Sequence, residues 1–229
     1  MRTGSKNGII VVAGTDTEIG KTTATCALLT ALRQAGKRAL GIKPVESGTA
    51  VQPNSDAEDG RRLARATGQI SPSQAFQRLK APLAPPVAAR DEGVELDPES
   101  WLDAIRDMSA VAEFTFVEGA GGLLSPLADG FNTRDLAIAL DASVLLVAVD
   151  KLGTLNHTML TLEALHVAGI NVAGVIFSAP EIPDESTGRN AEVIAERYPR
   201  IPVTSLPRIE SDEQGADILR PWLLKDDSQ

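Results

Sequence analysis

Short apolar runs alternate along the chain with longer stretches that have helical spacing. The apolar runs predict strands at 8–13, 38–42, 114–117, 143–149, 171–177 and 202–205. The longer stretches predict helices near 21–34, 55–67, 98–110, 133–140, 156–168 and 187–197. Strands that alternate with helices in this way form a parallel sheet with helices on its faces. We therefore expect an α/β fold with a parallel β-sheet flanked by helices.

The length of 229 residues, 43% of them hydrophobic, suits one compact domain spanning 1–229. We expect 1–7 and 224–229 to be flexible tails. The stretch 68–99 carries five prolines, too many for regular interior structure. It is predicted to be loop-rich and to form a lid or an edge of the domain.

The net charge of the chain limits the kinds of molecule that it can bind. The net charge is −9, and lysines and arginines are scattered along the sequence, which argues against binding to nucleic acid or an anionic membrane. No apolar run approaches the roughly 20 residues that cross a bilayer, and residues 1–8 are polar, unlike a signal peptide. These features predict a cytoplasmic protein. The one cysteine, Cys26, lies among apolar residues of a predicted helix, which indicates a packing role.

The segment between the first strand and the first helix has the features of a phosphate-binding loop. Gly14 is followed by five residues and then by Gly20, Lys21 and Thr22, where the helix opens. The usual spacing has four intervening residues, yet the context of strand, glycines and helix still favours nucleotide binding over an ordinary capped turn. Lys21 would reach the β- and γ-phosphate oxygens, and Thr22 would bind Mg²⁺.

A second cation is expected beside this loop. Lys43 follows the apolar strand at 38–42 directly, and Pro44 stiffens the chain after it. Because ligands collect at the carboxyl ends of parallel strands, Lys43 should lie near Lys21, whereas a surface lysine is the alternative. The turn that follows brings Ser47 to the same place, where its hydroxyl could contact a substrate.

Three carboxylates compete for a metal. Glu118 ends one predicted strand and is followed by glycines that let a ligand approach, which favours it over Asp150 at the end of another strand. Asp56 begins a predicted helix, where a carboxylate also serves as an ordinary cap. Spacing alone leaves the role of Asp56 open.

Taken together, these segments resemble the dethiobiotin synthetase family. The resemblance covers about residues 9–210 and rests on Gly-Thr-Asp-Thr-Glu-Ile-Gly-Lys-Thr, Lys-Pro-Val-Glu-Ser-Gly from Lys43, Asn-Ser-Asp ending at Asp56, Glu-Gly-Ala-Gly-Gly from Glu118 and Lys-Leu-Gly-Thr-Leu-Asn-His from Lys151. Related P-loop ligases of cobalamin synthesis share only the first motif and usually carry an amidotransferase domain, for which this chain has no room.

The resemblance implies a P-loop NTPase-like fold, a homodimer, and a ligase reaction. In that reaction 7,8-diaminononanoate and CO2 form a carbamate, ATP phosphorylates it to a mixed anhydride, and the second amine closes the ureido ring, releasing ADP and phosphate. Mg²⁺ and ATP would be required.

The resemblance also assigns residues. Lys43 and Lys21 match the catalytic lysines, and Thr22, Asp56 and Glu118 match the Mg²⁺ ligands, which would settle the choice against Asp150. The substrate would contact Ser47 and, across the dimer, the partner's loop containing Gly153, Thr154 and Asn156. Expected nucleotide contacts are Glu18, Ile19, Gly20, Lys21, Thr22, Thr23, Asp56, Glu118, Gly119, Ala120, Gly121, Ser178, Pro207, Arg208 and Ile209.

Two departures from the family pattern concern the base and the proline-rich stretch. Ser178 stands where the family often has asparagine and lacks its paired donor and acceptor, and Pro85-Pro86 replaces a common Pro-His. The sequence therefore predicts how the nucleotide base is recognised less clearly than it predicts how the phosphates are bound. The alternatives are another ATP-dependent ligase of the superfamily and a non-catalytic nucleotide switch. Partition-type switches carry an extra lysine early in the loop, where this chain has Thr15, Asp16 and Thr17.

Overall fold

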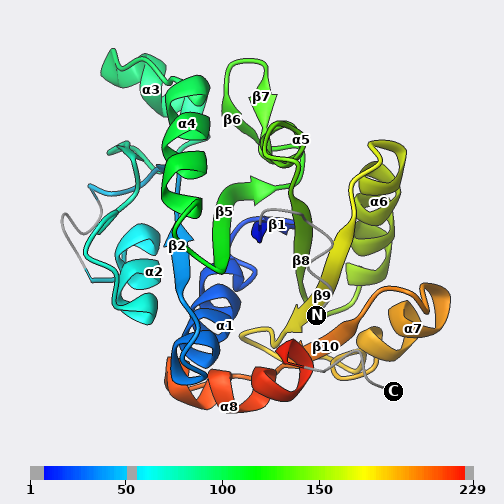
Figure 1. Cartoon of the computed structure of the whole chain (residues 1–229). Helices are drawn as coiled ribbons and strands as arrows, with labels where there is room; N and C mark the ends of the chain where they lie inside the picture. Colours follow the sequence, from blue (N-terminus) through cyan, green and yellow to red (C-terminus); the bar gives the residue numbers. More distant parts are fainter. Residues whose placement is uncertain (1–7, 51–55, 225–229) are drawn as a thin grey trace.

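A six-stranded parallel sheet forms the centre of the molecule (Figure 1). The computed structural model describes residues 8–50 and 56–224. The strand order is β10-β9-β8-β1-β5-β2. The strands are β1 (Ile9–Gly14), β2 (Ala39–Ile42), β5 (Phe114–Gly122), β8 (Ser143–Val149), β9 (Val172–Ser178) and β10 (Val203–Leu206). The predicted α/β fold class is confirmed.

Helices cover both faces of the sheet (Figure 1). One face packs against α1 (Lys21–Gln34), α2 (Asp59–Thr67) and α8 (Asp212–Leu223). The other face packs against α4 (Pro98–Ser109), α5 (Thr133–Ala139), α6 (Thr154–Val167) and α7 (Asn190–Arg197). Side chains of β1 alternate between the two faces of the sheet. Ile10 and Val12 pack on the α1 side, whereas Ile9 and Val11 pack on the α4 side. Every residue of β1 is buried.

The proline-rich stretch is more regular than predicted. It contains α3 (Pro85–Glu92) and the short strand β4 (Gln77–Arg78), which pairs in parallel with β3 (Val45–Glu46). Pro85 and Pro86 occupy the first helical positions, where a missing N–H leaves no helical hydrogen bond unmade. The prediction of a loop is therefore wrong for 85–92. A small hairpin, β6 (Pro126–Ala128) with β7 (Phe131–Asn132), follows β5.

The C-terminal helix α8 was not predicted from sequence. It packs on α1, and a Cβ atom added to Gly215 would lie 2.7 Å from the Cβ of Ala27, so the glycine permits the close approach. Of the predicted flexible tails 1–7 and 224–229, Leu224 is the C-cap of α8, and the other residues lie outside the described part of the chain.

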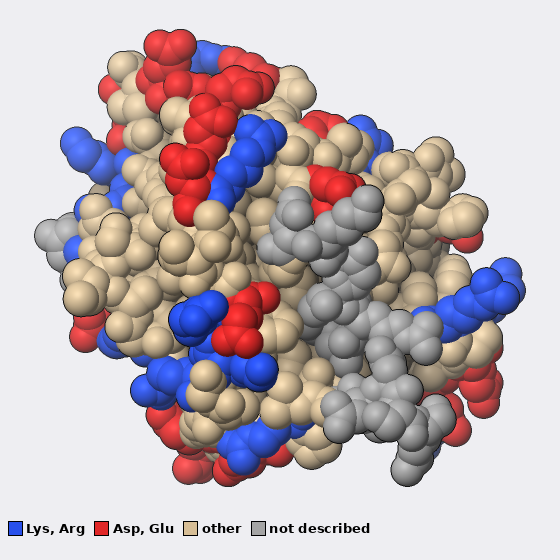
Figure 2. Space-filling view, in the orientation of Figure 1, with Lys and Arg blue, Asp and Glu red and all other residues tan. Residues whose placement is uncertain are grey.

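The topology creates a crevice at the carboxyl end of β1. The chain passes from β5, on one side of β1, to β8 on the other side, so the strand order reverses there. Charged residues are mixed over the face shown in Figure 2, with acidic side chains gathered where α3 and α4 lie. In the described residues, every helix is too short or too polar to cross a bilayer.

Candidate functional site

The loop between β1 and α1 presents backbone donors to the crevice. Gly20 is the N-cap of α1 with a left-handed φ of 88°, and the helical hydrogen bonds begin with Ala24 N donating to Gly20 O at 2.9 Å. The N–H groups of Lys21, Thr22 and Thr23 precede that bond and are free of helical partners. Such a helix start binds phosphate oxygens.

The side chain of Lys21 curls back over this loop. Its Nζ atom donates to the carbonyl oxygen of Asp16 at 2.8 Å. Close packing holds the loop in shape, because a Cβ on Gly14 would lie 2.8 Å from Asp16 O and 3.0 Å from Gly121 O. The ammonium group is therefore held against the phosphate loop, and its contact with the β- and γ-phosphates stays a prediction.

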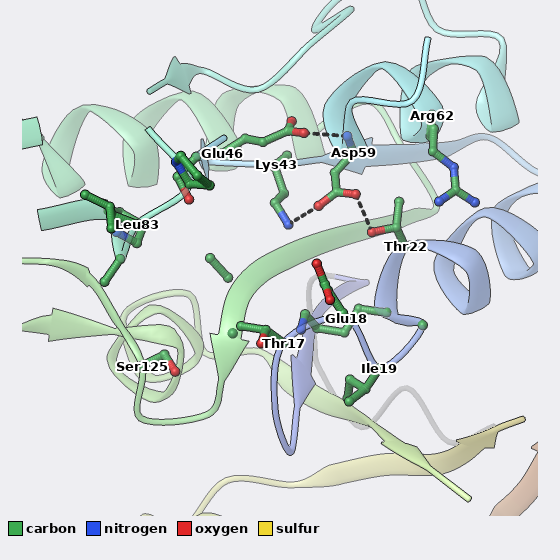
Figure 3. Close-up of a pocket in the computed structure, with 18 of the residues that line it drawn as sticks. Thr17, Glu18, Ile19, Thr22, Lys43, Glu46, Asp59, Arg62, Leu83 and Ser125 are labelled. Atoms are coloured by element: carbon green, nitrogen blue, oxygen red, sulfur yellow. Dashed lines mark hydrogen bonds and ion pairs between the residues drawn. The ribbon is translucent and has the colours of Figure 1, made fainter. Parts of the chain in front are cut away.

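Four elements meet around Lys43 (Figure 3). The Nζ atom lies 2.8 Å from Asp59 Oδ2, 2.8 Å from Glu118 Oε1 and 3.1 Å from Gly119 O. Thr22 Oγ1 lies 2.7 Å from Asp59 Oδ1 and 2.8 Å from Glu118 Oε1. The cluster thus ties together α1, α2, the residue after β2 and the middle of β5.

This arrangement fits a divalent cation. The hydroxyl of Thr22 has one proton and can donate to only one of its two carboxylate neighbours. Glu118 Oε2 is buried and has no hydrogen-bond partner within the described parts of the chain. Such a group of oxygen atoms has too few protons to hydrogen-bond every oxygen, and it therefore suits a hard cation such as Mg²⁺.

The protein would fill only part of such a metal's coordination shell. Among residues 8–50 and 56–224, no group of three or more His, Cys, Asp and Glu side chains lies at metal-binding distance. Thr22, Asp59 and Glu118 would supply a hydroxyl and two carboxylates, leaving positions for phosphate oxygens and water. That division is usual for Mg²⁺ in nucleotide sites.

The charges in the cluster perturb one another. Burial raises the pKa of Glu118, although Lys43 opposes the shift. Burial also acts on Asp59, but Lys43 and the Thr22 hydroxyl outweigh it and lower its pKa to about 2. Burial would lower the pKa of Lys43, yet its two carboxylate partners raise it. Burial and the nearby Lys43 lower the pKa of Lys21 to about 8.

The structure corrects the prediction for Asp56. Its side chain is 83% exposed and pairs with Arg65 at 3.1 Å, outside the Lys43 cluster. Helix α2 begins at Asp59 rather than near 55, so Asp59, on its first turn, meets Thr22 and Lys43 instead. Asp59 replaces Asp56 as the candidate metal ligand.

Glu46 positions Asp59 and was missed in the sequence. Its buried carboxylate accepts hydrogen bonds from the backbone N–H groups of Asp59 (2.6 Å) and Gly60 (3.1 Å), and so caps α2. Burial raises the pKa of Glu46. A Cβ on Gly60 would lie 2.2 Å from Ala75 N, which requires glycine at this helix start. No local sequence signal links Glu46 to α2.

A cavity of about 900 Å³ opens beside this cluster. Its walls include many of the predicted residues: Glu18, Ile19, Gly20, Lys21, Thr22, Thr23, Lys43, Ser47, Ala120 and Gly121. Glu118 lies fully buried, and the carbonyl of Gly119 faces Lys43. Asp59, Glu46 and Arg62 also line the cavity and had not been predicted.

Other predicted contacts lie away from the cavity wall. Ser178 is buried, and its hydroxyl donates to the carbonyl of Ile19, so it supports the phosphate loop; its expected contact with a base stays a prediction. Residues 207–209 follow the end of β10, and their role in base binding stays a prediction. The same holds for Gly153, Thr154 and Asn156 at the start of α6.

Asp150, the alternative to Glu118, is committed elsewhere. Its carboxylate accepts hydrogen bonds from Gly188 N at 2.8 Å and Asn190 Nδ2 at 2.6 Å. It therefore anchors the loop before α7.

Comparison with solved structures shows the fold alone. The septum site-determining protein MinD of Pyrococcus horikoshii has a TM-score of 0.58 at 16% identity, covering 94% of this chain and 93% of that one. A ParA family ATPase of Chlorobium tepidum has a TM-score of 0.58 at 13% identity, covering 95% and 99%. These neighbours support a P-loop NTPase fold.

Sequence comparison reaches the family. A family model described as an AAA domain matches residues 9–214. The ATP-dependent dethiobiotin synthetase of Anaeromyxobacter dehalogenans strain 2CP-C is 45% identical over 202 residues, covering 86% of this chain and 89% of that protein. The enzyme of the same name from Rhodococcus erythropolis strain PR4 is 43% identical over 187 residues, covering 80% and 81%. Such identity over most of both lengths, on a fold with this phosphate loop, shows that the chain belongs to the ATP-dependent dethiobiotin synthetases, ligases that form C–N bonds.

Proposed function

We propose that this chain joins 7,8-diaminononanoate and CO2 into the ureido ring of dethiobiotin, using Mg-ATP. The observation that carries the proposal is the buried contact of Lys43 with Asp59 and Glu118, beside the phosphate loop. This contact concentrates two carboxylates and two lysines at one end of the cavity. Two lysines beside two carboxylates can both hold a metal-bound nucleotide and stabilise negative charge on a second substrate.

The first step proposed is carbamate formation. One amine of the substrate bonds to the carbon of CO2 and loses a proton, giving a carbamate anion. Ser47, on the turn after β3, lines the cavity and offers a hydroxyl to the substrate. The Lys43 ammonium, at the same end, favours the anionic product electrostatically.

The second step is phosphoryl transfer. A carbamate oxygen bonds to the γ-phosphorus of ATP as the bond to ADP breaks, giving a carbamic-phosphoric anhydride. Lys21 and Lys43 would offset the negative charge that develops. Thr22, Asp59 and Glu118 would hold Mg²⁺, which when bound neutralises phosphate charge. In the last step the second amine bonds to the carbonyl carbon and phosphate leaves.

We also propose that two copies of the chain form the working enzyme. Residues 153–156 do not line the cavity of their own protomer, so a second copy would have to bring them to the substrate carboxylate. Large apolar side chains are exposed on the surrounding surface, including Leu124 (54%), Leu152 (81%) and Leu160 (61%). Leu124 and Leu160 line one shallow pocket together, and exposed apolar side chains that lie together mark interaction surfaces. Sedimentation equilibrium should give twice the 24.1 kDa of one chain, and a monomer would contradict the proposal.

The reaction is tested by phosphate release from Mg-ATP with bicarbonate, measured with and without 7,8-diaminononanoate, alongside mass spectrometry of the product. We expect phosphate release that depends on the diamine and a cyclic urea product. Release without the diamine, or none with it, would point to a different ligase or to a nucleotide switch.

A further inference from the structure

Arg62 is a third cation on the cavity wall. It lies on α2, three residues after Asp59, so both side chains leave the same side of the helix. Its guanidinium Nη2 atom is 3.2 Å from Thr23 Oγ1, on the first turn of α1. Figure 3 shows Arg62 reaching from α2 toward α1, with Thr22 between it and Lys43.

Among the residues that the structure describes, Arg62 has no ion-pair partner. Its neighbours on α2 have carboxylate partners: Arg61 pairs with Glu58 at 3.4 Å, and Arg65 with Asp56 at 3.1 Å. Within 8–50 and 56–224, no carboxylate oxygen lies at ion-pair distance from Arg62. Its one hydrogen bond among these residues goes to a neutral hydroxyl. A half-buried guanidinium thus keeps several donors available.

The surroundings of Arg62 favour a phosphate as its ligand. The backbone N–H groups of Lys21, Thr22 and Thr23 are free of helical partners, and Arg62 lies beside the last of them. Lys21 and Lys43 lie toward the other end of this row. A planar guanidinium binds phosphate oxygens well and stays charged across the physiological pH range.

We propose that Arg62 binds the phosphate of ATP nearest the nucleoside, while Lys21 and Lys43 serve the phosphate that is transferred. The triphosphate would then lie along the start of α1, with its inner phosphate at Thr23 and its outer phosphate at Lys43. This assignment rests on the proposed binding of Mg-ATP in the cavity. The competing role for Arg62 is a purely structural tie between α2 and α1 through Thr23.

Titration with Mg-ADP and Mg-ATP separates these roles. Arg62→Ala should weaken both nucleotides by about 10- to 100-fold, the effect of losing a hydrogen bond to a charged group. Both should weaken equally, because ADP retains the inner phosphate. Arg62→Lys should recover part of the affinity, since it restores the charge without the planar fork. Arg65→Ala, one turn further along α2, is the matched control and should bind as the parent does.

Three outcomes would overturn the assignment. Equal nucleotide affinity in Arg62→Ala and the parent, with a lower melting temperature, would show a structural tie. A loss of affinity for Mg-ATP alone would indicate that Arg62 binds the outer phosphate instead. A folded parent protein that does not bind Mg-ADP would overturn nucleotide binding at this site as well. If the parent binds Mg-ADP and Arg62→Ala binds it equally well, only the role of Arg62 is overturned.

Discussion

Two buried carboxylates of the same sheet, one within β5 and one directly after β8, have different environments. Glu118 on β5 and Asp150 after β8 are 0% and 4% exposed. Both oxygens of Asp150 accept hydrogen bonds from the loop before α7. Glu118 shares one oxygen between Lys43 and Thr22 and leaves the other without a partner in the described structure.

The difference shows that burial at a strand end does not by itself indicate a metal ligand. A carboxylate such as that of Asp150, whose two oxygens both accept hydrogen bonds from the protein, stabilises the fold. A carboxylate that keeps an unused oxygen beside a hydroxyl and a lysine has capacity for a ligand. Substitutions in the Lys43 cluster and at Asp150 test this difference between the two carboxylates.

Replacing Lys43 should have the largest effect. Lys43→Ala removes the cation that faces both carboxylates of the site, and turnover should fall about 100-fold or more, as for other preorganised charge stabilisers. Mg-ADP affinity should change much less, because the phosphate loop is intact. Steady-state kinetics and titration measure the two effects. Lys37→Ala, an exposed pair with Glu113, is the control. Unchanged turnover would remove Lys43 from catalysis.

Replacing Asp59, on the first turn of α2, and Asp56, three residues before it, tests the revised metal ligand. Asp59→Asn should weaken Mg-dependent nucleotide binding by about 10- to 100-fold, the range found even for outer-shell metal partners. Asp56→Asn should stay within about twofold, because an exposed ion pair contributes little. Titration of ADP over a series of Mg²⁺ concentrations measures both. The reverse ranking would restore Asp56.

The comparison of Glu118 with Asp150 can be made directly by amide substitution. Glu118→Gln should raise the Mg²⁺ concentration needed for half-maximal activity by about tenfold, since an amide is a poorer ligand for a hard cation. Asp150→Asn should leave that concentration unchanged but lower the free energy of unfolding by about 1–3 kcal/mol. Urea denaturation provides the second measurement. A metal defect in Asp150→Asn alone would reverse the assignment.

A smaller effect is expected from pH. Lys21 has a lowered pKa of about 8, whereas carboxylates raise the pKa of Lys43 and keep it charged. Phosphate favours protonated Lys21, so Mg-ADP affinity is full below pH 8 and falls as pH rises through it. Between pH 7 and 8.5 the loss should be about fourfold. Calorimetry in buffers of different ionisation enthalpy should show proton uptake near pH 8. A flat profile would contradict this pKa.

The sheet could be predicted because its strands are unusually clear in the sequence. Residues 9–13 and 144–149 are continuous apolar runs, as expected for strands buried on both faces. The errors have local causes. Pro85 and Pro86 suggested a loop but begin a helix, and Gly215 and Pro221 obscured the pattern of α8.

The site could be predicted only where strand ends determine it. Lys43 follows β2, and Glu118 follows the apolar run 114–117 within β5; because these strands are parallel neighbours, the two residues come together. Asp59 depends on the residue at which α2 begins, and a shift of one helical turn separates it from Asp56. Glu46 and Arg62 act across elements distant in sequence, and only the folded chain shows their partners.

Helix α1 is buried along most of its length. Eleven of its 14 residues are buried, whereas only four of the 12 in α4 are. It carries Lys21 and Thr22 at its start and packs Cys26 and Ala27 into the core one turn later. A library of all single substitutions should therefore find α1 the least tolerant helix, with losses of folding and of ligation that coincide. The outward face of α4 should accept changes freely, which makes it the better place for labels or for attachment to a support.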